Sequence, residues 1–266
     1  MNECVIILPT HSAYRDVCEN FIKLYKRNWP DCKYKFVVSV CGEDILFEDT
    51  LSVYCGENAT LLDCVRIVKE KFSAYIYFVF LGDAFLCSEV NSEEVELFIN
   101  EIRRYQISYC RLYPQIMKSK RIRLGRWFRK INNKDRYAHS FIAFACTPDY
   151  IENEMTEGRS DFDYESKYLE EAERAENSYY YKDHVMLIKN IFHILPGIEK
   201  GKWDRLVLLK LKIQNPDINF CKRDKISYRW QIYLITRRIL VILIPEKIRR
   251  DIKRIIYRKE LFTTKQ

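Results

Sequence analysis

Short, almost purely apolar runs alternate with amphipathic helical stretches along the first half of this 266-residue chain. The runs CVIIL at 4–8, KYKFVVSV at 33–40 and YIYFVFL at 75–81 are long enough for buried strands and too short for buried helices. The third run lacks the alternation of a half-exposed strand, so it predicts a strand that is covered on both faces. ISYCRL at 107–112 and SFIAFAC at 140–146 continue the series. This order predicts an α/β fold with a mostly parallel, Rossmann-type sheet flanked by helices.

Signals for helix starts and ends lie between these runs. Val17, Phe21, Leu24 and Tyr25 share one helical face, and that helix should end at Trp29, because a residue before proline avoids helical backbone. Further helices are expected after Thr60 as N-cap, after Asn91 with Glu94 as a capping box, and after Thr147 with Pro148 in the first turn.

The pattern changes after residue 113. The stretch 118–136 holds nine basic residues and one acidic residue, and it predicts a loop. The segment EGRSDFDYES at 157–166 predicts a polar turn, followed by a charged helix at about 166–176. We expect the apolar segments near 180–189 and 193–203 to close the core.

The net charge of +8 is confined to the end of the chain, since residues 224–266 contain twelve basic and four acidic side chains. We therefore predict a neutral domain at 1–223 and a basic tail at 224–266. The apolar run 230–244 is too short and too charged to span a bilayer. Residues 246–259 place isoleucines on one helical face and seven Lys or Arg on the other, a pattern typical of a helix that lies on an anionic membrane surface. The alternative is that these isoleucines pack onto the domain or onto a second subunit.

Ten scattered cysteines without a C-x-x-C pair argue against a zinc site and against a small secreted disulfide scaffold. The N-terminus has no basic segment before its apolar run, so no signal peptide is expected. These features predict reduced, mostly buried thiols in a cytoplasmic protein. The basic tail predicts that this protein is peripheral on the inner face of the cell membrane.

Residues that could bind a ligand or take part in catalysis follow the predicted strands. Ligands bind at this position in doubly wound sheets. Asp83 follows the run at 75–81, and a carboxylate there suits a nucleotide-diphosphate site with a divalent cation, although an Asp next to Gly82 is also an ordinary turn residue. Asp163 and Glu165 lie near a helix start, where carboxylates occur for capping alone or act as a general base. Thr10, His11 and Tyr14 follow the first strand and could hold a nucleotide base, and the alternative for His11 is an ordinary loop residue.

The order of several motifs resembles bacterial glycosyltransferases of capsular polysaccharide and lipopolysaccharide O-chain synthesis, which are GT-A-like. The turn WPDCKY at 29–34 is similar to the family's W-P-D-C-P-Y turn, and LGDAFL at 81–86 stands where the family has L-D-D-x-F-L. FDYE at 162–165 and GKW at 201–203 are similar to the later W-D-F-E and G-K-W elements. The resemblance covers about residues 4–205, and Gly82 departs from it where the family has a first Asp.

The resemblance implies a hexosyltransferase-type enzyme that moves a sugar from a nucleotide-sugar donor to a hydroxyl of a lipid-linked glycan in capsule, exopolysaccharide or O-antigen biosynthesis. Glu165, or Asp163 before it, would be the catalytic base, and Asp83 would face the diphosphate directly or through weakly bound, donor-assisted Mg²⁺ or Mn²⁺. The remaining donor-binding residues would be Thr10, His11, Tyr14, Ser39, Cys41, Arg121, Arg123 and Arg126, the three arginines neutralising phosphate unless they belong to a solvated loop.

Two other classes of function stay open at this point. Gly82 keeps a catalytically inactive GT-A-like interaction protein of a polysaccharide assembly in consideration. The basic runs and 19 tyrosines suggest a nucleic-acid binder. The neutral body contains no known nucleic-acid motif and its aromatic residues fall in apolar strands, so we expect no nucleic-acid partner.

Overall fold

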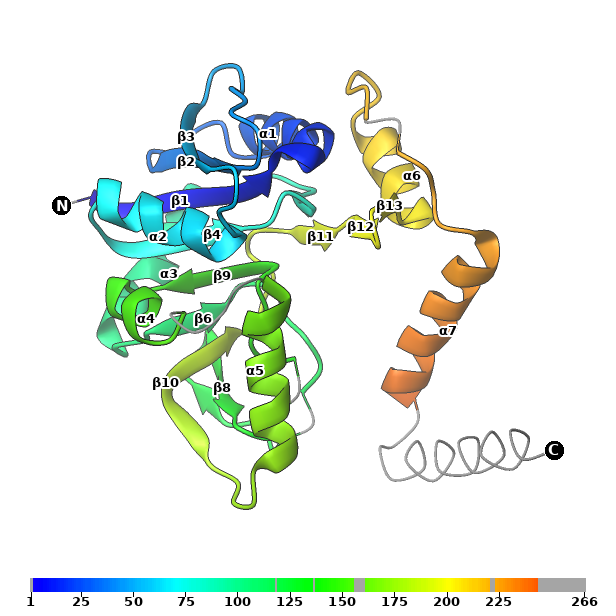
Figure 1. Ribbon diagram of the computed structural model, residues 1–266. Helices are drawn as coiled ribbons and strands as arrows, with labels where there is room; N and C mark the ends of the chain where they lie inside the picture. The colour runs from blue at the N-terminus through cyan, green and yellow to red at the C-terminus, as the bar shows by residue number, and fades with distance from the viewer. Residues whose placement is uncertain (1, 118, 136, 156–160, 221–222, 244–266) are drawn as a thin grey trace. The chain divides into compact units, whose positions relative to one another are not determined.

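The computed structural model of the protein describes residues 2–117, 119–135, 137–155, 161–220 and 223–243. They divide into two compact units, Met1–Gly197 with Leu211–Cys221 and Ile198–Lys210 with Lys222–Gln266. Residues 224–243, the described part of the segment predicted as a separate tail, fall in the second unit together with 198–210. The helices are α1 (Arg15–Asn28), α2 (Leu61–Lys71), α3 (Ser92–Arg104), α4 (Pro148–Asn153), α5 (Asp161–Arg174), α6 (Arg205–Gln214) and α7 (Tyr228–Leu243), with a 3-10 helix η1 (Ser12–Tyr14) (Figure 1).

A nine-stranded sheet forms the first unit, in the order β3-β2-β1-β4-β9-β6-β10-β8-β7. Strands β1, β2, β3, β4, β6, β7 and β10 run in one direction, and β8 and β9 run in the opposite direction. The predicted α/β class with a mainly parallel sheet is therefore confirmed. The strands are β1 (Asn2–His11), β2 (Lys35–Cys41), β3 (Leu51–Gly56), β4 (Ala74–Phe80), β5 (Ala84–Leu86), β6 (Tyr109–Arg111), β7 (Arg123–Leu124), β8 (Phe128–Asn132), β9 (Ala143–Cys146), β10 (Tyr180–Leu187), β11 (Ile194–Pro196), β12 (Ile198–Glu199) and β13 (Lys202–Trp203).

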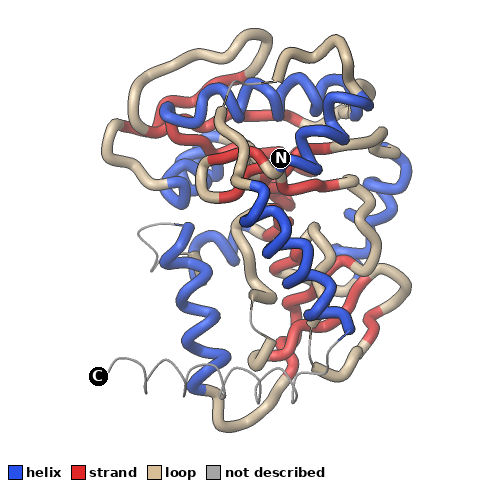
Figure 2. The backbone as a smooth tube through the Cα atoms, turned by 90° about the vertical axis from the view of Figure 1, so that its right-hand side faces the viewer, coloured by secondary structure: helices blue, strands red, loops and turns tan. Residues whose placement is uncertain are grey.

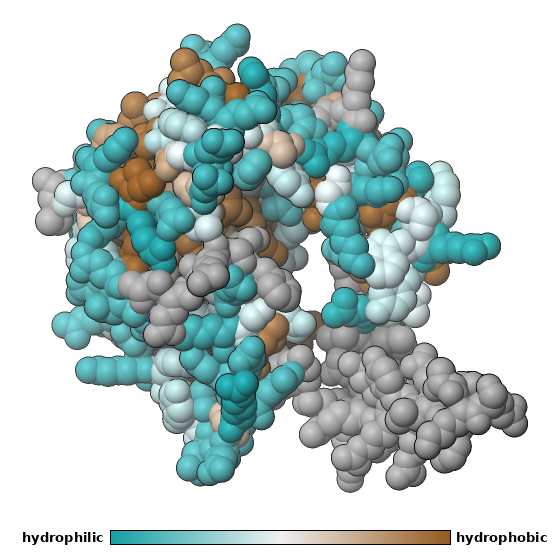
Figure 3. All heavy atoms as spheres, viewed as in Figure 1, coloured by the Kyte–Doolittle hydropathy of each residue, from teal (hydrophilic) through white to brown (hydrophobic). Residues whose placement is uncertain are grey.

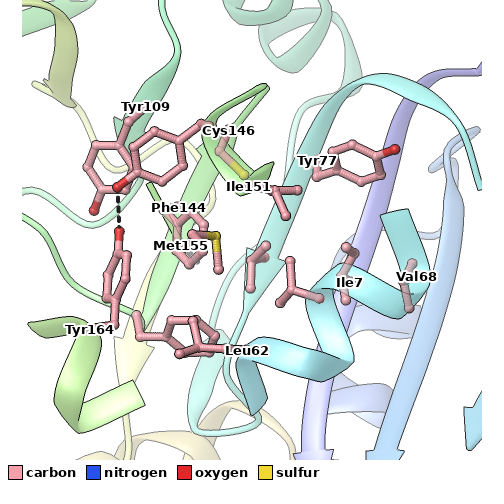
Figure 4. Packing of buried hydrophobic residues seen from close by; sticks show 14 of the residues in the cluster. Ile7, Leu62, Val68, Tyr77, Tyr109, Phe144, Cys146, Ile151, Met155 and Tyr164 are labelled. Carbon is pink, nitrogen blue, oxygen red and sulfur yellow. Dashed lines mark hydrogen bonds between the residues drawn. The ribbon is translucent and has the colours of Figure 1, made fainter. Parts of the chain in front are cut away.

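Helices cover both faces of this sheet, as Figures 1 and 2 show from two directions. Ile7 of β1 and Val79 of β4 pack in a buried cluster with side chains of α2, α4 and α5 (Figure 4). Phe78 and Phe80 point to the opposite face, where Phe80 lies 6.0 Å from Phe21 of α1 and Phe78 lies 6.0 Å from Phe98 of α3, between ring centroids. Because successive strand residues point to opposite faces, a run without polar residues requires cover on both sides.

The N-caps predicted at Thr60, Asn91 and Thr147 are confirmed. Of the capping box predicted for Asn91 and Glu94, the structure shows the bond to the Asn91 side chain, and the Glu94 carboxylate accepts from Lys189. Thr60 and Asp63 form a reciprocal capping box at α2, and the side chains of Asn91 and Thr147 accept hydrogen bonds from backbone N–H groups in the first turns of α3 and α4. Each cap satisfies a backbone donor that the helix itself leaves unpaired.

Two predictions about local structure were wrong. The stretch 118–136 is not a loop throughout, because it contains the strands β7 and β8. Arg129 within it is buried, and its guanidinium donates to the carbonyl of Ser119, so this basic residue does not mark a solvated surface. Helix α5 begins at Asp161 and not near 166, so the acidic segment at 161–165 forms its first turns. Carboxylates are favoured there by the positive end of the helix dipole.

Candidate functional site

The carboxyl ends of β1, β2 and β4 form one edge of the sheet. β1 pairs in parallel with β2 and β4, with His11 opposite Cys41 and Ile7 opposite Val79. This register brings the predicted donor-binding residues of the first two strands together. Thr10, Ser39 and Cys41 are buried at this edge, whereas His11 and Tyr14 are exposed.

The loops after β1 and β2 are tied to each other. His11 accepts a hydrogen bond from Ala13 N–H through Nδ1 at 3.1 Å, and the Ser12 hydroxyl accepts one from Glu43 N–H at 3.0 Å. Gly42 has a φ of +86°, and a Cβ there would lie 2.5 Å from the Ser12 hydroxyl. Glycine suits this close approach and this positive φ. The conformation of the loops after β1 and β2 therefore depends on glycine at position 42.

Asp83 lies where β4 leaves the sheet. The N–H of Leu81 donates to the Ile142 carbonyl at 2.8 Å, and the Asp83 carbonyl accepts from Gly197 N–H at 3.0 Å. A Cβ built on Gly82 lies 3.7 Å from both the Cα and the N of Cys18 in α1. This distance is ordinary van der Waals contact, so space alone does not require glycine at position 82, and Asp83 is the carboxylate of this turn.

Glu165 of α5 binds the segment that leads into β9, next to the end of β4. Its Oε1 accepts hydrogen bonds from the Ser140 hydroxyl at 2.8 Å and from Phe141 N–H at 2.9 Å. Residues 140–142 lead into β9, and Ile142 bonds to Leu81, two residues before Asp83. The Glu165 carboxylate and the backbone of Leu81 are thus both bonded to the segment 140–142. Asp163 lies two residues earlier on α5 and is exposed.

Arg111 at the end of β6 is a buried charge that the sequence patterns did not single out. Its Nε donates to the Tyr113 carbonyl at 2.9 Å and its guanidinium also donates to the Tyr137 carbonyl. Burial lowers the pKa of Arg111, and the negative charge of Glu165 acts against that shift. The only signal in the sequence is a charged residue that ends the apolar run ISYCRL.

A buried hydrogen-bonded network of histidines, tyrosines and Glu154 lies next to the segment that binds Glu165. His139 Nε2 and His184 Nδ1 are 3.1 Å apart, and His184 Nε2 lies 3.1 Å from Glu154 Oε1. In neutral His184, Nε2 donates to Glu154 and Nδ1 accepts from His139. Tyrosine hydroxyls extend the network from Glu154: Tyr168 donates to Glu154 at 2.9 Å, and Tyr150 lies 2.8 Å from both Tyr168 and Tyr164.

This network holds the segment that carries Ser140. Tyr109 lies beside Tyr150, with ring centroids 5.1 Å apart, and its hydroxyl accepts from Ser140 N–H at 3.0 Å. Figure 4 shows Tyr109 and Tyr164 within the buried cluster. Tyr164 is the residue before Glu165, and His139 is the residue before Ser140. The network therefore joins α5 to the segment that binds Glu165 Oε1. Residues 139 and 184 are 45 positions apart, so no local pattern could have revealed the contact.

Stability should fall as the pH drops below 6.5. Burial, with the nearby charges of His184, Arg111 and Lys167, holds the pKa of His139 well below its ordinary value of 6.5. Between the two pKa values the unfolded chain binds a proton that the folded chain does not, so the free energy of unfolding decreases with falling pH by up to about 1.4 kcal/mol per unit. Burial raises the pKa of Glu154, but bonds from His184 outweigh it and the net shift is downward, which removes further stability below about pH 4.5.

Urea unfolding between pH 8 and pH 5 measures this effect. His139→Phe should flatten the slope between pH 6.5 and pH 5, because phenylalanine keeps the stacking on Tyr168 and does not titrate. His193→Asn is the matched control, since His193 lies outside the network and its φ of 49° suits asparagine. An unchanged slope in His139→Phe would assign the pH dependence to other groups.

The three predicted arginines lie at the other end of the sheet. Arg121, Arg123 and Arg126 are exposed and belong to the β7–β8 region, and the Arg126 guanidinium lies 4.9 Å from the centre of the Trp127 ring. In the strand order, β9, β6, β10 and β8 lie between β4 and β7. The structure therefore does not bring these arginines close to Asp83. Arg111 on β6 lies closer in strand order to β4, the strand before Asp83, than the three arginines do.

The residues at this edge do not build a complete metal site. Within the described ranges, no group of three or more His, Cys, Asp or Glu side chains is placed to hold a metal ion. Asp83 can offer one carboxylate, which fits only a cation whose other oxygen ligands come from the donor.

The chain matches no protein-family model and no curated protein sequence. Among solved structures, it is similar to a cytidylyltransferase from Leptospira borgpetersenii serovar Hardjo-bovis, with a TM-score of 0.46 and 13% identity over 92% of this chain and 98% of that chain. It is also similar to a fragment of S. aureus TarS, with a TM-score of 0.43 and 10% identity over 70% of this chain and 58% of that one. A UDP-glucose pyrophosphorylase complexed with UDP-glucose gives a TM-score of 0.40 and 9% identity over 81% and 98% of the two chains. These likenesses are too distant to carry function to this chain.

Proposed function

We propose that the protein is a glycosyltransferase that moves a sugar from a nucleotide-sugar donor to a hydroxyl group of a glycan. The observation that carries the proposal is the anchoring of Glu165 to Ser140 and Phe141, beside the strand end that leads to Asp83. A carboxylate held by two hydrogen bonds next to a nucleotide-binding strand edge is suited to act as a general base.

In this proposal the donor lies along the carboxyl ends of β1, β2 and β4. Thr10, His11, Ser39 and Cys41 line the base and ribose end, with Tyr14 exposed above them. The Ser39 hydroxyl is buried and has no hydrogen-bond partner among the described residues, so a donor atom or a water molecule would satisfy it. Asp83 faces the diphosphate.

Glu165 takes the proton from the acceptor hydroxyl, whose oxygen attacks the anomeric carbon as the bond to the diphosphate breaks. Oε1 is occupied by Ser140 and Phe141, and Oε2 has no partner among the residues that the structure describes. One oxygen thus orients the carboxylate and the other is available to the acceptor. Donor-assisted Mg²⁺ or Mn²⁺ at Asp83 would offset negative charge on the leaving diphosphate.

A screen of nucleotide sugars by thermal shift tests the proposal. UDP-, GDP- or CMP-linked sugars should raise the melting temperature, since a ligand at 100 times its Kd adds about 2.7 kcal/mol of stability. Asp83→Ala should weaken that binding by about tenfold and leave the unliganded melting temperature nearly unchanged. Asp31→Ala, at an exposed turn position, is the matched control.

Each outcome assigns a function. Donor binding with turnover supports the enzyme, and donor binding without turnover identifies the catalytically inactive interaction protein that Gly82 suggested. The absence of binding by every donor contradicts the proposal. Activity that persists in excess chelator would remove the cation from it.

We further propose that the acceptor is lipid-linked, of capsule, exopolysaccharide or O-antigen type, and that the protein is peripheral on the inner face of the cell membrane. No helix of the described residues is long and apolar enough to cross a membrane. Tyr228, Ile232, Tyr233 and Ile239 of α7 are exposed, and Arg229 and Arg237 lie on the same helix. Figure 3 shows apolar side chains beside hydrophilic ones at the surface of this unit. The predicted basic helix at 246–259 lies outside the described residues.

A further inference from the structure

Arg111 carries a buried positive charge on β6, the strand between β9 and β10 in the sheet (Figure 1). The residue is only 4% exposed. Its Nε donates to the Tyr113 carbonyl at 2.9 Å, and Nη1 donates to the Tyr137 carbonyl. Both acceptors are neutral, and within the described ranges no Asp or Glu forms an ion pair with this guanidinium. A buried charge without an opposite charge is unfavourable, so this guanidinium is suited to meet an anion from outside the chain.

One nitrogen of the Arg111 guanidinium remains available to a ligand. Nη2 has no hydrogen-bond partner among the residues that the structure describes, because the two bonds of this side chain use Nε and Nη1. The side-chain nitrogens and oxygens that are both unpartnered and sealed from solvent do not include any atom of Arg111. Nη2 therefore keeps contact with solvent, and a dissolved anion can reach it there.

Hydrogen bonds join Arg111 to the segment that anchors Glu165. Arg111 donates to the carbonyl of Tyr137, three residues before Ser140. The Ser140 hydroxyl in turn donates to Glu165 Oε1 at 2.8 Å. Tyr109 lies two residues before Arg111 on the same face of β6, and its hydroxyl accepts from Ser140 N–H at 3.0 Å. The guanidinium and the candidate general base are thus held by one short segment, 137–140, so an anion on Arg111 would lie on the side of the sheet that carries Glu165.

We propose that Arg111 binds an oxyanion of the substrate, a phosphate or a carboxylate, beside Glu165. Nη2 carries two N–H groups, and a hydrogen bond between a guanidinium and an oxyanion is strengthened because both partners are charged. Two sources carry this chemistry: the diphosphate of a nucleotide-sugar donor and an acidic sugar of the acceptor glycan. The identity of the substrate rests on the proposed function, whereas anion binding by Arg111 does not.

Arg129 on β8 offers a matched control for the structural part of this role. Met186 of β10 pairs with Arg111 on one side and with Arg129 on the other, so the two arginines lie at one level and on one face of the sheet. Arg129 is also buried, and it donates to the Ser119 carbonyl at 2.5 Å. The buried carboxylate of Asp135 accepts from the hydroxyl of the same Ser119 at 2.5 Å, so Arg129 has an opposite charge nearby within the chain.

Two probes, inorganic pyrophosphate and glucuronate, test the proposal on the full-length protein. Each is titrated by isothermal calorimetry at constant ionic strength, so that screening by salt stays the same. We expect at least one probe to bind, and Arg111→Gln to weaken that binding at least about tenfold, because a charge-assisted hydrogen bond is lost. Arg129→Gln should bind the probe as the unaltered chain does. Loss of pyrophosphate binding assigns the anion to the donor, and loss of glucuronate binding assigns it to the acceptor.

Three results would overturn the proposal: no binding of either probe, binding that Arg111→Gln leaves unchanged, or an equal loss in Arg111→Gln and Arg129→Gln. Failure of the proposed function looks different. If no nucleotide sugar binds but a probe still depends on Arg111, the anion site stands without the glycosyltransferase. If nucleotide sugars bind and react while Arg111→Gln keeps full affinity for the probes, only the anion site fails.

Circular dichroism of each variant is the folding control. If Arg111→Gln does not fold, hydrogen exchange of the unaltered chain decides. A bound probe should slow backbone exchange in peptides that cover 109–113 and 137–141, the segments around the Arg111 guanidinium. Protection confined to the loops after β1 and β2 would place the probe elsewhere and overturn the proposal.

Discussion

Glu165→Gln should lower the turnover rate by about 10²–10⁴-fold, the usual cost of losing one general base. Glutamine has the same shape, and its side-chain carbonyl can still accept the hydrogen bonds from Ser140 and Phe141. The substitution therefore removes the base without removing the anchor. We expect an unchanged melting temperature and unchanged donor protection, so that the loss falls on kcat.

Asp163→Asn is the matched control, since Asp163 is exposed and lies two residues earlier on the same helix. Its rate should stay within a few-fold of the unaltered enzyme. If Asp163→Asn abolishes turnover and Glu165→Gln does not, Asp163 is the base. If both variants are fully active, the acidic turn of α5 serves only the fold.

Signals that depend on neighbours in sequence predicted the fold well. The caps at Thr60, Asn91 and Thr147 depend on a side chain and a backbone N–H three residues later, which a sequence shows directly. The strands near 4–8, 33–40 and 75–81 were also found, because a run covered on both faces has a distinctive composition.

Orientation and edge strands could not be predicted in the same way. SFIAFAC reads as a buried strand in either direction, and its antiparallel pairing with β4 is decided by the chain path outside it. The strands β7 and β8 were missed because Arg129 is buried and satisfied by Ser119, a residue ten positions away.

The candidate site shows the same division. Thr10, Ser39, Cys41 and Asp83 lie at or beside strand ends, since parallel strands put their carboxyl ends at one edge, and their role in donor binding stays a prediction. The contact between Glu165 and Ser140 joins α5 to the entry of β9, and the buried pair of His139 and His184 joins segments that are distant in the sequence. Such contacts arise from tertiary packing and leave no periodicity.

Removing the positive charge of residues 246–259 should release the protein from anionic vesicles. The full-length chain has seven Lys or Arg in this segment, and each basic residue near an anionic surface contributes about 1 kcal/mol. If half of them contact the surface, their replacement by Gln weakens partitioning by about two to three orders of magnitude. High salt should have the same effect on the unaltered protein, because screening shortens the reach of surface charge.

Co-sedimentation with vesicles that contain phosphatidylserine measures this partitioning. The matched control replaces Lys120, Arg121, Arg123 and Arg126 by Gln, which removes exposed positive charge from the β7–β8 region and leaves the tail intact. A chain ending at Leu243 is a second test, and it keeps the pairing of Ile226 N–H with the Trp203 carbonyl that an earlier end at Asp224 would remove. The control should still sediment and the shortened chain should not. If the shortened chain sediments like the full-length chain, the tail does not bind membranes, and its isoleucines are left to pack on the protein or on a second subunit.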